Sequence, residues 1–302
     1  MASPQAAKII SMLRSQPRPS SAPTYEQSRH GMEAFARPAD ADVRCTPVDA
    51  NGVPAEWVDG PGVDGARVIL YLHGGGYTAG SIVTHRQLAG WLSKAAGTRV
   101  LIIDYRLAPE HPHPAAVDDA VAAYQFLLGQ GIAPGHVVIA GDSAGGGLTA
   151  AALIAIRDRG IALPAGGVMI SAWTDISGSG ESLNTRASLD PMISDGGVGL
   201  RRSARAYQPE GSLTAPTASP LFADLAGLPP LLIQVGTHEV LFDDSTRFDA
   251  AARAAGVETT LEVWNEMVHV FHVFAWMLPE AREAIESFGA FVKERTGAGG
   301  AE

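Results

Sequence analysis

The chain has 302 residues, of which 46% are hydrophobic and 18% are charged. This composition supports a large buried core and argues against an intrinsically disordered protein. The net charge is −10 with no basic stripe, so nucleic acid is not an expected partner. The length suits one large α/β domain with an insertion, or two small domains.

Cys45 is the single cysteine of the chain. An intrachain disulfide is therefore impossible, and the fold does not depend on an oxidising compartment. We expect Cys45 in a strand rather than as a catalytic thiol. The apolar run at residues 9–13 is too short for a signal-peptide core or a membrane span. We therefore expect a cytoplasmic protein with no membrane partner.

The first 72 residues contain helical stretches and then strands. Residues 6–14 and 25–36 have helical spacing with thin apolar faces, as in a lid that lies on another part of the molecule. Further on, Asn51-Gly52 separates two β-branched runs and predicts a β-hairpin over residues 43–58. The nearly continuous apolar run at residues 66–72 predicts a parallel strand that is buried on both faces.

Three glycines follow this buried strand directly, in His73-Gly74-Gly75-Gly76. One interpretation is that these glycines are merely a flexible loop. Without side chains, however, consecutive backbone N–H groups can face a cavity, as the binding of a tetrahedral oxyanion requires. The next strand is expected at residues 98–104, followed by a proline-rich stretch and a helix over residues 116–128. The histidines of that stretch, His111 and His113, lack metal-ligand spacing, so no metal site is expected.

The central motif is Gly141-Asp142-Ser143-Ala144-Gly145, which lies between a β-branched run at residues 137–140 and a helix-forming run at residues 148–159. A serine between glycines at a strand-to-helix corner fits G-x-S-x-G, the turn that exposes a nucleophilic hydroxyl. Ser143 is therefore the candidate nucleophile. A phosphate-binding corner is the alternative, but no Gly-Lys-Ser/Thr or G-x-G-x-x-G is present, and Asp142 would repel phosphate.

A second lid piece is expected after the strand predicted at residues 167–173. Residues 176–217 are rich in Gly, Ser and Pro around one amphipathic piece at residues 198–207, which predicts an insertion above the sheet. Alternation then resumes with strands at 230–235 and 259–264, a helix at 243–255, and a helix from about residue 267 to a disordered tail at 297–302. The predicted division is a cap of residues 1–42 and 176–217 and a core of residues 43–175 and 218–302.

The acid and the base are expected after the last two strands, because Ser143 emerges at the same edge of a parallel sheet. Glu239 directly follows its strand and is favoured as the acid. Asp243 is the competitor, although it could instead stabilise the start of a helix. His269 is favoured as the base over His272, which is expected one turn further on as a packing histidine; His238 has no evident partner.

His73-Gly74-Gly75-Gly76, residues 105–110 (Tyr-Arg-Leu-Ala-Pro-Glu), the Ser143 motif and residues 269–271 together resemble the bacterial hormone-sensitive-lipase family of α/β-hydrolase esterases. The resemblance covers residues 66–275. It implies an α/β-hydrolase fold with a mostly parallel sheet and a helical cap, and it also implies homodimers. The implied roles are Ser143 as nucleophile, His269 as base, and Gly75, Gly76 and Ala144 as N–H donors to the oxyanion. Most members have Asp-Pro-Leu where this chain has Glu239-Val240-Leu241.

These residues predict a serine carboxylesterase that forms an acyl-enzyme with a Ser-His-Glu triad, and the small cap favours short- to medium-chain esters. This mechanism needs no metal or organic cofactor. A lactone hydrolase is the nearest alternative, since a cyclic ester enters the same mechanism. An amidase would use the same chemistry. A non-catalytic ligand-binding relative, such as the gibberellin receptors, would be expected to lack a triad member.

Overall fold

A mostly parallel β-sheet lies at the centre of the computed structural model, which describes all residues except 1, 17–21, 194, 196 and 298–302. In the described part of the chain, eight strands form one sheet in the order β1-β2-β4-β3-β5-β6-β7-β8. The pairs β1–β2 and β2–β4 are antiparallel, and the others are parallel. The strands are β1 (Arg44–Asp49), β2 (Pro54–Asp59), β3 (Asp64–Leu72), β4 (Thr98–Ile103), β5 (Val137–Asp142), β6 (Gly166–Ile170), β7 (Leu231–Gly236) and β8 (Thr259–Trp264).

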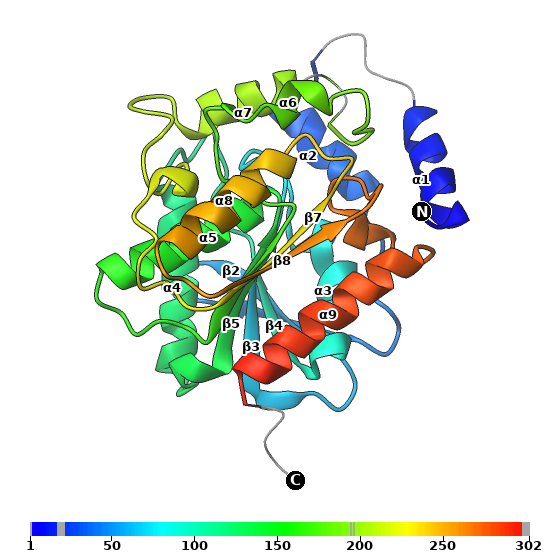
Figure 1. The fold of residues 1–302 in the computed structure, drawn as a ribbon. Helices are drawn as coiled ribbons and strands as arrows, with labels where there is room; N and C mark the ends of the chain where they lie inside the picture. The colour runs from blue at the N-terminus through cyan, green and yellow to red at the C-terminus, as the bar shows by residue number, and fades with distance from the viewer. Residues whose placement is uncertain (1, 17–21, 194, 196, 298–302) are drawn as a thin grey trace.

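Helices cover both faces of this sheet (Figure 1). The side chains of β3 alternate between two buried clusters: Leu70 lies in one, with residues of α4, α5 and α8, and Ile69 lies in the other, with residues of α3 and α9. Burial on both faces explains the continuous apolar run that predicted this strand. The helices are α3 (Ile82–Ala96), α4 (Ala115–Gly129), α5 (Ala144–Asp158), α8 (Phe242–Ala254) and α9 (Pro279–Arg295).

The predicted hairpin is present as β1 and β2. Asn51 and Gly52 both have positive φ angles, of 59° and 87°, as a tight hairpin turn requires. Asp49 Oδ1 also accepts a hydrogen bond of 2.6 Å from the Gly52 N–H. Cys45 lies in β1, as expected, and is partly buried.

The prediction of a helix from about residue 267 is wrong. The chain instead forms an irregular segment over residues 265–278 with one short 3-10 turn, η3 (Phe271–Phe274), and α9 begins only at Pro279. Val270 has a φ of 49°, which a helix cannot accommodate, and Pro279 is suited to the first turn of a new helix. Helix α3 was not predicted, and α5 begins at Ala144, four residues before the predicted start.

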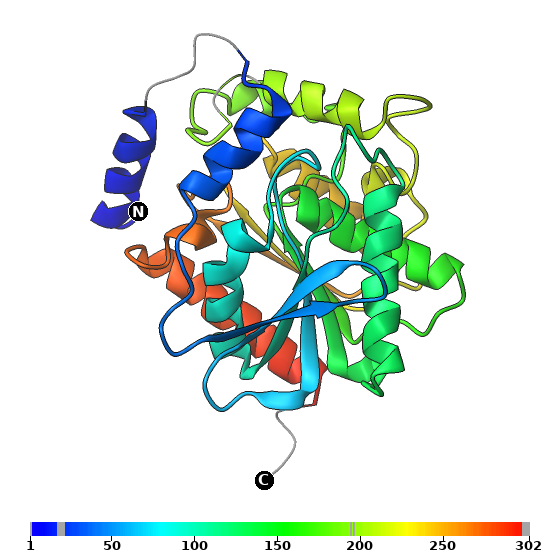
Figure 2. The same cartoon turned by 180° about the vertical axis from the view of Figure 1, so that it is seen from behind.

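The predicted cap segments contain α1 (Pro4–Arg14), α2 (Tyr25–Ala34), α6 (Ser182–Thr185) and α7 (Val198–Tyr207). Both views place α2 and α7 close together beyond one edge of the sheet (Figures 1 and 2). Arg202 of α7 stacks over the Tyr25 ring of α2 at 4.1 Å. Helix α1 lies apart from them, and its Ile9 belongs to the same buried cluster as Met267 and Leu278. The first helix therefore packs against the segment that carries His269.

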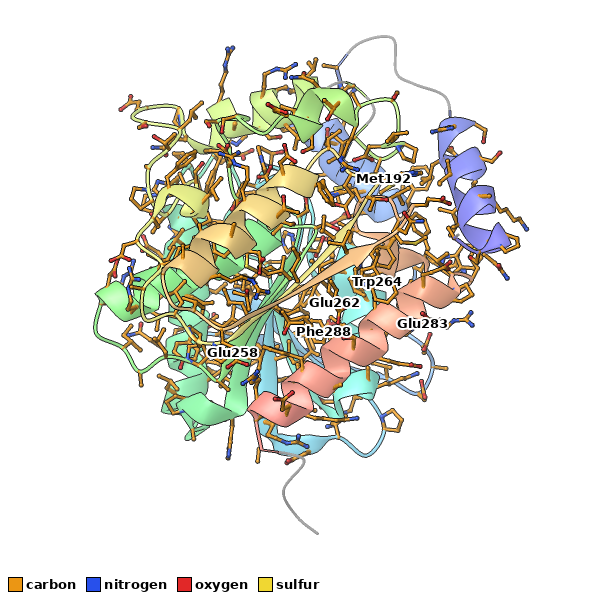
Figure 3. The ribbon with its side chains drawn as sticks, in the orientation of Figure 1. Met192, Glu258, Glu262, Trp264, Glu283 and Phe288 are labelled. Atoms are coloured by element: carbon orange, nitrogen blue, oxygen red, sulfur yellow. The ribbon has the colours of Figure 1, made fainter. Side chains whose placement is uncertain are left out.

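Helix α9 is fastened to the last two strands by polar contacts as well as by its apolar face. Glu262 of β8 accepts hydrogen bonds from Gln234 Nε2 of β7, at 2.8 Å, and from the Ser287 hydroxyl of α9. Phe288 of α9 is completely buried; Figure 3 marks it together with Glu262. These contacts hold the two strands that precede the predicted acid and base. Among the described residues, no helix is long and apolar enough to cross a membrane.

Candidate active site

Ser143 stands at the sharp turn between β5 and α5. Its backbone angles, φ 54° and ψ −120°, are rare for a residue with a side chain and store strain at this position. The Ser143 N–H donates to the Ile170 carbonyl at 2.8 Å, and the Ser143 carbonyl accepts from the Trp173 N–H at 2.8 Å. These two bonds tie the turn to the end of the neighbouring strand β6.

The glycines of the motif are required because backbones approach closely on both sides of the turn. A Cβ atom at Gly145 would lie 1.9 Å from the Leu72 carbonyl oxygen, and one at Gly141 would lie 2.4 Å from the same atom. Real Cβ atoms do not come this close to an oxygen, so neither position accepts a side chain. The sequence interpretation of these glycines as spacers between strand and helix therefore has a direct steric basis.

The structure brings Ser143, His269 and Glu239 together at the carboxyl edge of the sheet. The distance from His269 Nε2 to Ser143 Oγ is 3.0 Å, and that from His269 Nδ1 to Glu239 Oε2 is also 3.0 Å. Glu239 is completely buried, whereas Ser143 and His269 keep 8% and 6% of their surface exposed. A hydroxyl, an imidazole and a carboxylate thus form a continuous hydrogen-bonded chain from three separate loops.

The surroundings of His269 favour its protonated form. Burial would lower the pKa of its imidazolium, but the hydrogen bond and the negative charge of Glu239 outweigh that effect and raise the pKa above its usual value. Burial raises the pKa of Glu239 itself, and the bonds from His269 and the Gly236 N–H oppose that rise. An imidazole of raised pKa beside a serine hydroxyl is arranged to accept the proton of that hydroxyl.

The competing residues lie elsewhere. Asp243 is in the first turn of α8 and accepts a hydrogen bond of 2.8 Å from the Ser182 N–H. His272 is completely buried, its Nε2 is 3.0 Å from Gln234 Oε1, and burial lowers its pKa to about 3. It is therefore a neutral packing histidine. Among the described residues, His238 Nδ1 is buried and has no hydrogen-bond partner.

Three backbone N–H groups near Ser143 are the expected oxyanion donors. Among the described residues, no turn or loop hydrogen bond is donated by the N–H groups of Gly75, Gly76 or Ala144. Gly75 and Gly76 have positive φ angles of 124° and 63°, a conformation that favours glycine. The preceding Gly74 N–H is bound instead by Asp142 Oδ1 at 3.1 Å, so the residue before the serine anchors the glycine loop.

Three polar residues around the site were not identified from the sequence. Ser171 contacts both Glu239 and the His269 segment. Asp190, in the predicted cap insertion, accepts a hydrogen bond of 3.0 Å from the N–H of Val240, the residue after Glu239. Arg29 of α2 binds the Thr78 carbonyl, just after the glycine loop, at 2.9 Å. Ser171 directly follows a parallel strand, and Glu239 and His269 come a few residues after the ends of theirs. This position at the end of a strand was the sequence signal that could have identified Ser171.

Known proteins resemble this chain in sequence and in fold. The model of a protein family described as alpha/beta hydrolase fold matches residues 69–273 of the chain. The chain belongs to the α/β-hydrolase family. An acetyl-hydrolase of Streptomyces hygroscopicus is 51% identical to this α/β-hydrolase over 245 residues, which are 81% of each chain.

Solved structures agree over almost the whole of this α/β-hydrolase. An esterase/lipase from an uncultured bacterium is 47% identical, with a TM-score of 0.95 over 98% of this chain and 100% of that one. An esterase from the bacterial hormone-sensitive lipase family is 45% identical, with a TM-score of 0.93 over 98% and 99%. The resemblance to the bacterial hormone-sensitive-lipase family is thereby confirmed.

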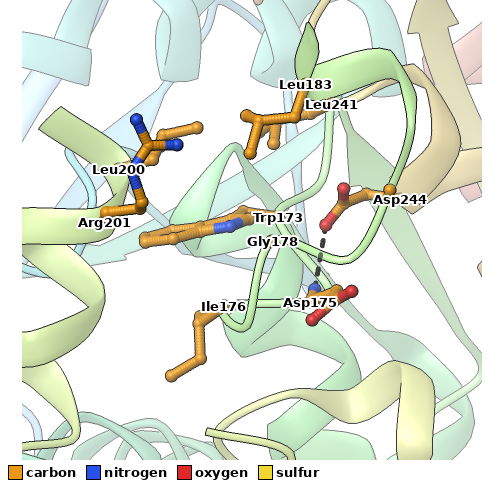
Figure 4. Close-up of a pocket in the computed structure, with 10 residues that line it drawn as sticks. Trp173, Asp175, Ile176, Gly178, Leu183, Leu200, Arg201, Leu241 and Asp244 are labelled. Atoms are coloured by element: carbon orange, nitrogen blue, oxygen red, sulfur yellow. Dashed lines mark hydrogen bonds between the residues drawn. The ribbon is translucent and has the colours of Figure 1, made fainter. Parts of the chain in front are cut away.

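A hollow lies between the Trp173 ring and residues of the segment 176–217 (Figure 4). Leu183 and Leu200 line it from the insertion, and Asp244 lines it from α8. Asp244 Oδ1 accepts hydrogen bonds of 2.9 Å from the N–H groups of Thr174 and Asp175. Burial raises the pKa of Asp244 to about 8, so this carboxyl is mostly neutral at pH 7.

This pKa predicts that Asp244→Asn stabilises the protein increasingly as pH rises. The unfolded carboxyl loses its proton near pH 3.9, whereas the folded one holds it to about pH 8, so folding loses stability between these values. The amide imitates the protonated form and avoids that loss. We expect the Tm of the variant minus the Tm of the parent to increase by at least about 2 °C between pH 4 and pH 9 in thermal melts, which corresponds to about 1 kcal/mol. A constant difference across this range would contradict the assignment.

Proposed function

We propose that this chain hydrolyses carboxylic esters with short to medium acyl chains, with Ser143 as nucleophile, His269 as base and Glu239 as acid. The chain is a carboxylic ester hydrolase, as are the relatives that share its fold and nearly half of its sequence. The observation that carries the residue roles is the pair of 3.0 Å contacts that link the serine, the imidazole and the carboxylate. A hydroxyl that faces an oriented imidazole is activated for attack on an acyl carbon.

The reaction follows from these contacts. His269 Nε2 takes the hydroxyl proton while Ser143 Oγ bonds to the ester carbonyl carbon, and Glu239 stabilises the resulting imidazolium. The N–H groups of Gly75, Gly76 and Ala144 bind the oxyanion. The bond to the alcohol oxygen then breaks, and His269 returns the proton to the leaving alcohol. Water attacks the acyl-enzyme in the same way, which releases the carboxylic acid and restores the serine.

The acyl preference rests on the space beside the nucleophile and on one relative. The Trp173 ring, Leu183 and Leu200 bring bulky apolar side chains together in the hollow, and the Trp173 N–H bonds to the Ser143 carbonyl at 2.8 Å. The relative from Streptomyces hygroscopicus is named an acetyl-hydrolase, and acetyl is a short acyl group. Both features favour short acyl chains over long ones. The proposed substrate partner is accordingly a small-molecule ester.

The cap assignment is part of the same proposal. Residues 1–42 and 176–217 would form the cap, and residues 43–175 and 218–302 would form the catalytic core. Support comes from the packing of Arg202 on Tyr25, which joins the two cap segments, and from the bond between Arg29 and Thr78, which joins the first of them to the glycine loop. We propose a cytoplasmic location, because a fold with the single cysteine Cys45 needs no oxidising compartment.

A homodimer is also proposed. Strand β8 ends the sheet, so its outer backbone groups are available to a second strand, and Val263 on it is 48% exposed. Exposed edge strands with apolar side chains are ready sites for pairing between chains. A second copy that pairs along β8 would cover both the backbone groups and Val263.

Variants of the proposed triad provide the main test. With p-nitrophenyl butyrate we expect Ser143→Ala and His269→Ala to lose at least about 10³-fold in kcat, and Glu239→Gln about 10²-fold or more, because each loses part of one proton-transfer unit. His272→Ala is the matched control, since His272 bonds to Gln234 and not to the serine. It should keep kcat within about tenfold of the parent. Inactivity of His272→Ala in a folded protein, with an active His269→Ala, would reverse the assignment of the base.

The same assay distinguishes between substrate classes. We expect turnover of the p-nitrophenyl ester to exceed that of a matched anilide and of small lactones, because the proposal is an esterase. Faster turnover of a lactone would favour the lactone-hydrolase alternative. Without any Ser143-dependent release of p-nitrophenol, the non-catalytic alternative would be favoured.

The pH profile provides a separate prediction. The free enzyme needs neutral His269, and Glu239 raises the pKa of this imidazole above its usual value of about 6.5. The value of kcat/KM should therefore fall tenfold per pH unit on the acid side, with a midpoint above about pH 6.5. The measurement is kcat/KM between pH 5 and pH 9 at constant ionic strength. A rate that is unchanged down to pH 5 would exclude His269 as the base.

The dimer is tested by light scattering after size-exclusion chromatography. The chain mass is 31.5 kDa, so the parent should elute at about twice this mass. Val263→Lys should shift the population to the monomer because a buried charge opposes pairing. Val83→Lys is the control, since Val83 is 41% exposed on α3, away from β8. A monomeric parent, or a dimer that Val263→Lys leaves intact, would reject the β8 interface.

A further inference from the structure

One buried hydroxyl lies between the loops of the proposed acid and base. Ser171 directly follows β6, the strand between those that lead to the nucleophile and to the acid. It is completely buried and has a φ of 48°, which is rare for a residue with a side chain. Its N–H donates to the Gln234 carbonyl at 2.7 Å, so the sheet itself determines where the side chain starts.

The Ser171 hydroxyl makes two hydrogen bonds in defined directions. It accepts from the Val270 N–H at 3.0 Å and donates to Glu239 Oε1 at 2.8 Å. An amide nitrogen can only donate here and an ionised carboxylate can only accept, so the single hydroxyl proton must point to Glu239. One side chain thus contacts both the acid and the backbone next to His269.

The bond to Glu239 orients the carboxylate. Oε1 receives both the Ser171 hydroxyl and the Gly236 N–H, the latter at 2.6 Å. Oε2 is thereby directed to His269 Nδ1. If the hydroxyl were removed, Oε1 would keep a single donor and the carboxyl group would be freer to rotate away from the imidazole.

The bond to Val270 holds the base from the other side. Val270 directly follows His269 and has a φ of 49°, a strained conformation for a β-branched residue. Such a conformation persists only where surrounding contacts enforce it. The Ser171 oxygen supplies one such contact at the peptide bond that joins Val270 to His269.

We propose that Ser171 is a positioning residue that aligns Glu239 and His269 for proton transfer from Ser143. The inference rests on the proposed function of these three residues. Ser171 does not contact the serine hydroxyl in the structure and acts only through the acid and the base. Its contribution should therefore appear in the chemical step and in the proton affinity of the base, and not in substrate binding.

The first test is Ser171→Ala with p-nitrophenyl butyrate, with rates corrected for the folded fraction. We expect kcat to fall about 10- to 100-fold, since small misplacements of catalytic groups have effects of this size, while KM stays within about twofold. The acid limb of kcat/KM should move to lower pH, because a poorly held Glu239 supports the imidazolium less. An unchanged kcat, or an acid limb that does not move, would overturn the proposal.

Ser93→Ala is the matched control. Ser93 is also completely buried, accepts from the Gly60 N–H at 2.9 Å and donates to the Thr98 carbonyl at 2.8 Å, but it lies in α3, away from the triad. A similar loss of Tm with an unchanged kcat and pH profile is expected for this variant. If Ser93→Ala lowered kcat as much as Ser171→Ala does, the effect would be one of general stability and the proposal would fail.

A double-mutant cycle with Glu239→Gln tests whether Ser171 acts through the acid. In the Glu239→Gln background, the decrease in log kcat caused by Ser171→Ala should be less than half of the decrease that the same substitution causes in the parent. An equal loss in both backgrounds would overturn the proposal.

Ser171→Cys is the second variant, in case Ser171→Ala does not fold. The thiol is a weaker hydrogen-bond donor of similar shape, so kcat should fall less than in Ser171→Ala. A kcat equal to that of the parent would again overturn the proposal. If Ser143→Ala is inactive and Ser171→Ala keeps the kcat of the parent, only this inference fails, whereas an active Ser143→Ala would overturn the proposed function itself.

Discussion

The site depends on the tight turn at Ser143, where strand β5 passes directly into helix α5. Two backbone hydrogen bonds, from Ser143 to Ile170 and from Trp173 to Ser143, hold this turn against the next strand. The turn is possible only because Gly145 lets the helix approach the Leu72 carbonyl. The strained serine is thereby fixed at the carboxyl edge of the sheet, where parallel strands deliver the loops that carry the other groups.

Buried carboxylates connect this turn to the loops on both sides. Asp142 binds the Gly74 N–H and lies near His85, so it fastens the glycine loop to the strand that carries the serine. Glu239 binds Ser171 and His269 on the other side. A buried charge is stable only with several donors, and here the donors come from the segments that must be aligned. The same contacts that satisfy the charges therefore also determine the geometry of the site.

Sequence reasoning succeeded where one local feature carries the information. The Asn51-Gly52 pair predicted its hairpin, and Gly141 and Gly145 marked the strand-to-helix turn at Ser143, because backbone conformation at these positions restricts the residue type. It failed over residues 265–278, where apolar residues at mixed spacing imitate a helix. There the burial of Val268 and Phe271 and the hydrogen bond of the Val270 N–H determine the backbone conformation. None of these contacts can be recognised in the local sequence.

By itself, the sequence predicted the order of the strands, the strand-to-helix turn at Ser143, the glycine loop and the chemical class of the reaction. These follow from residue types at short spacing, which reflect local backbone and chemical requirements. Only the tertiary structure decided that Glu239 rather than Asp243 faces the imidazole and that His272 turns to Gln234. Such choices depend on where strands β6, β7 and β8 bring loops that are far apart in the chain. Contacts across 30 to 126 residues leave no pattern in any one segment.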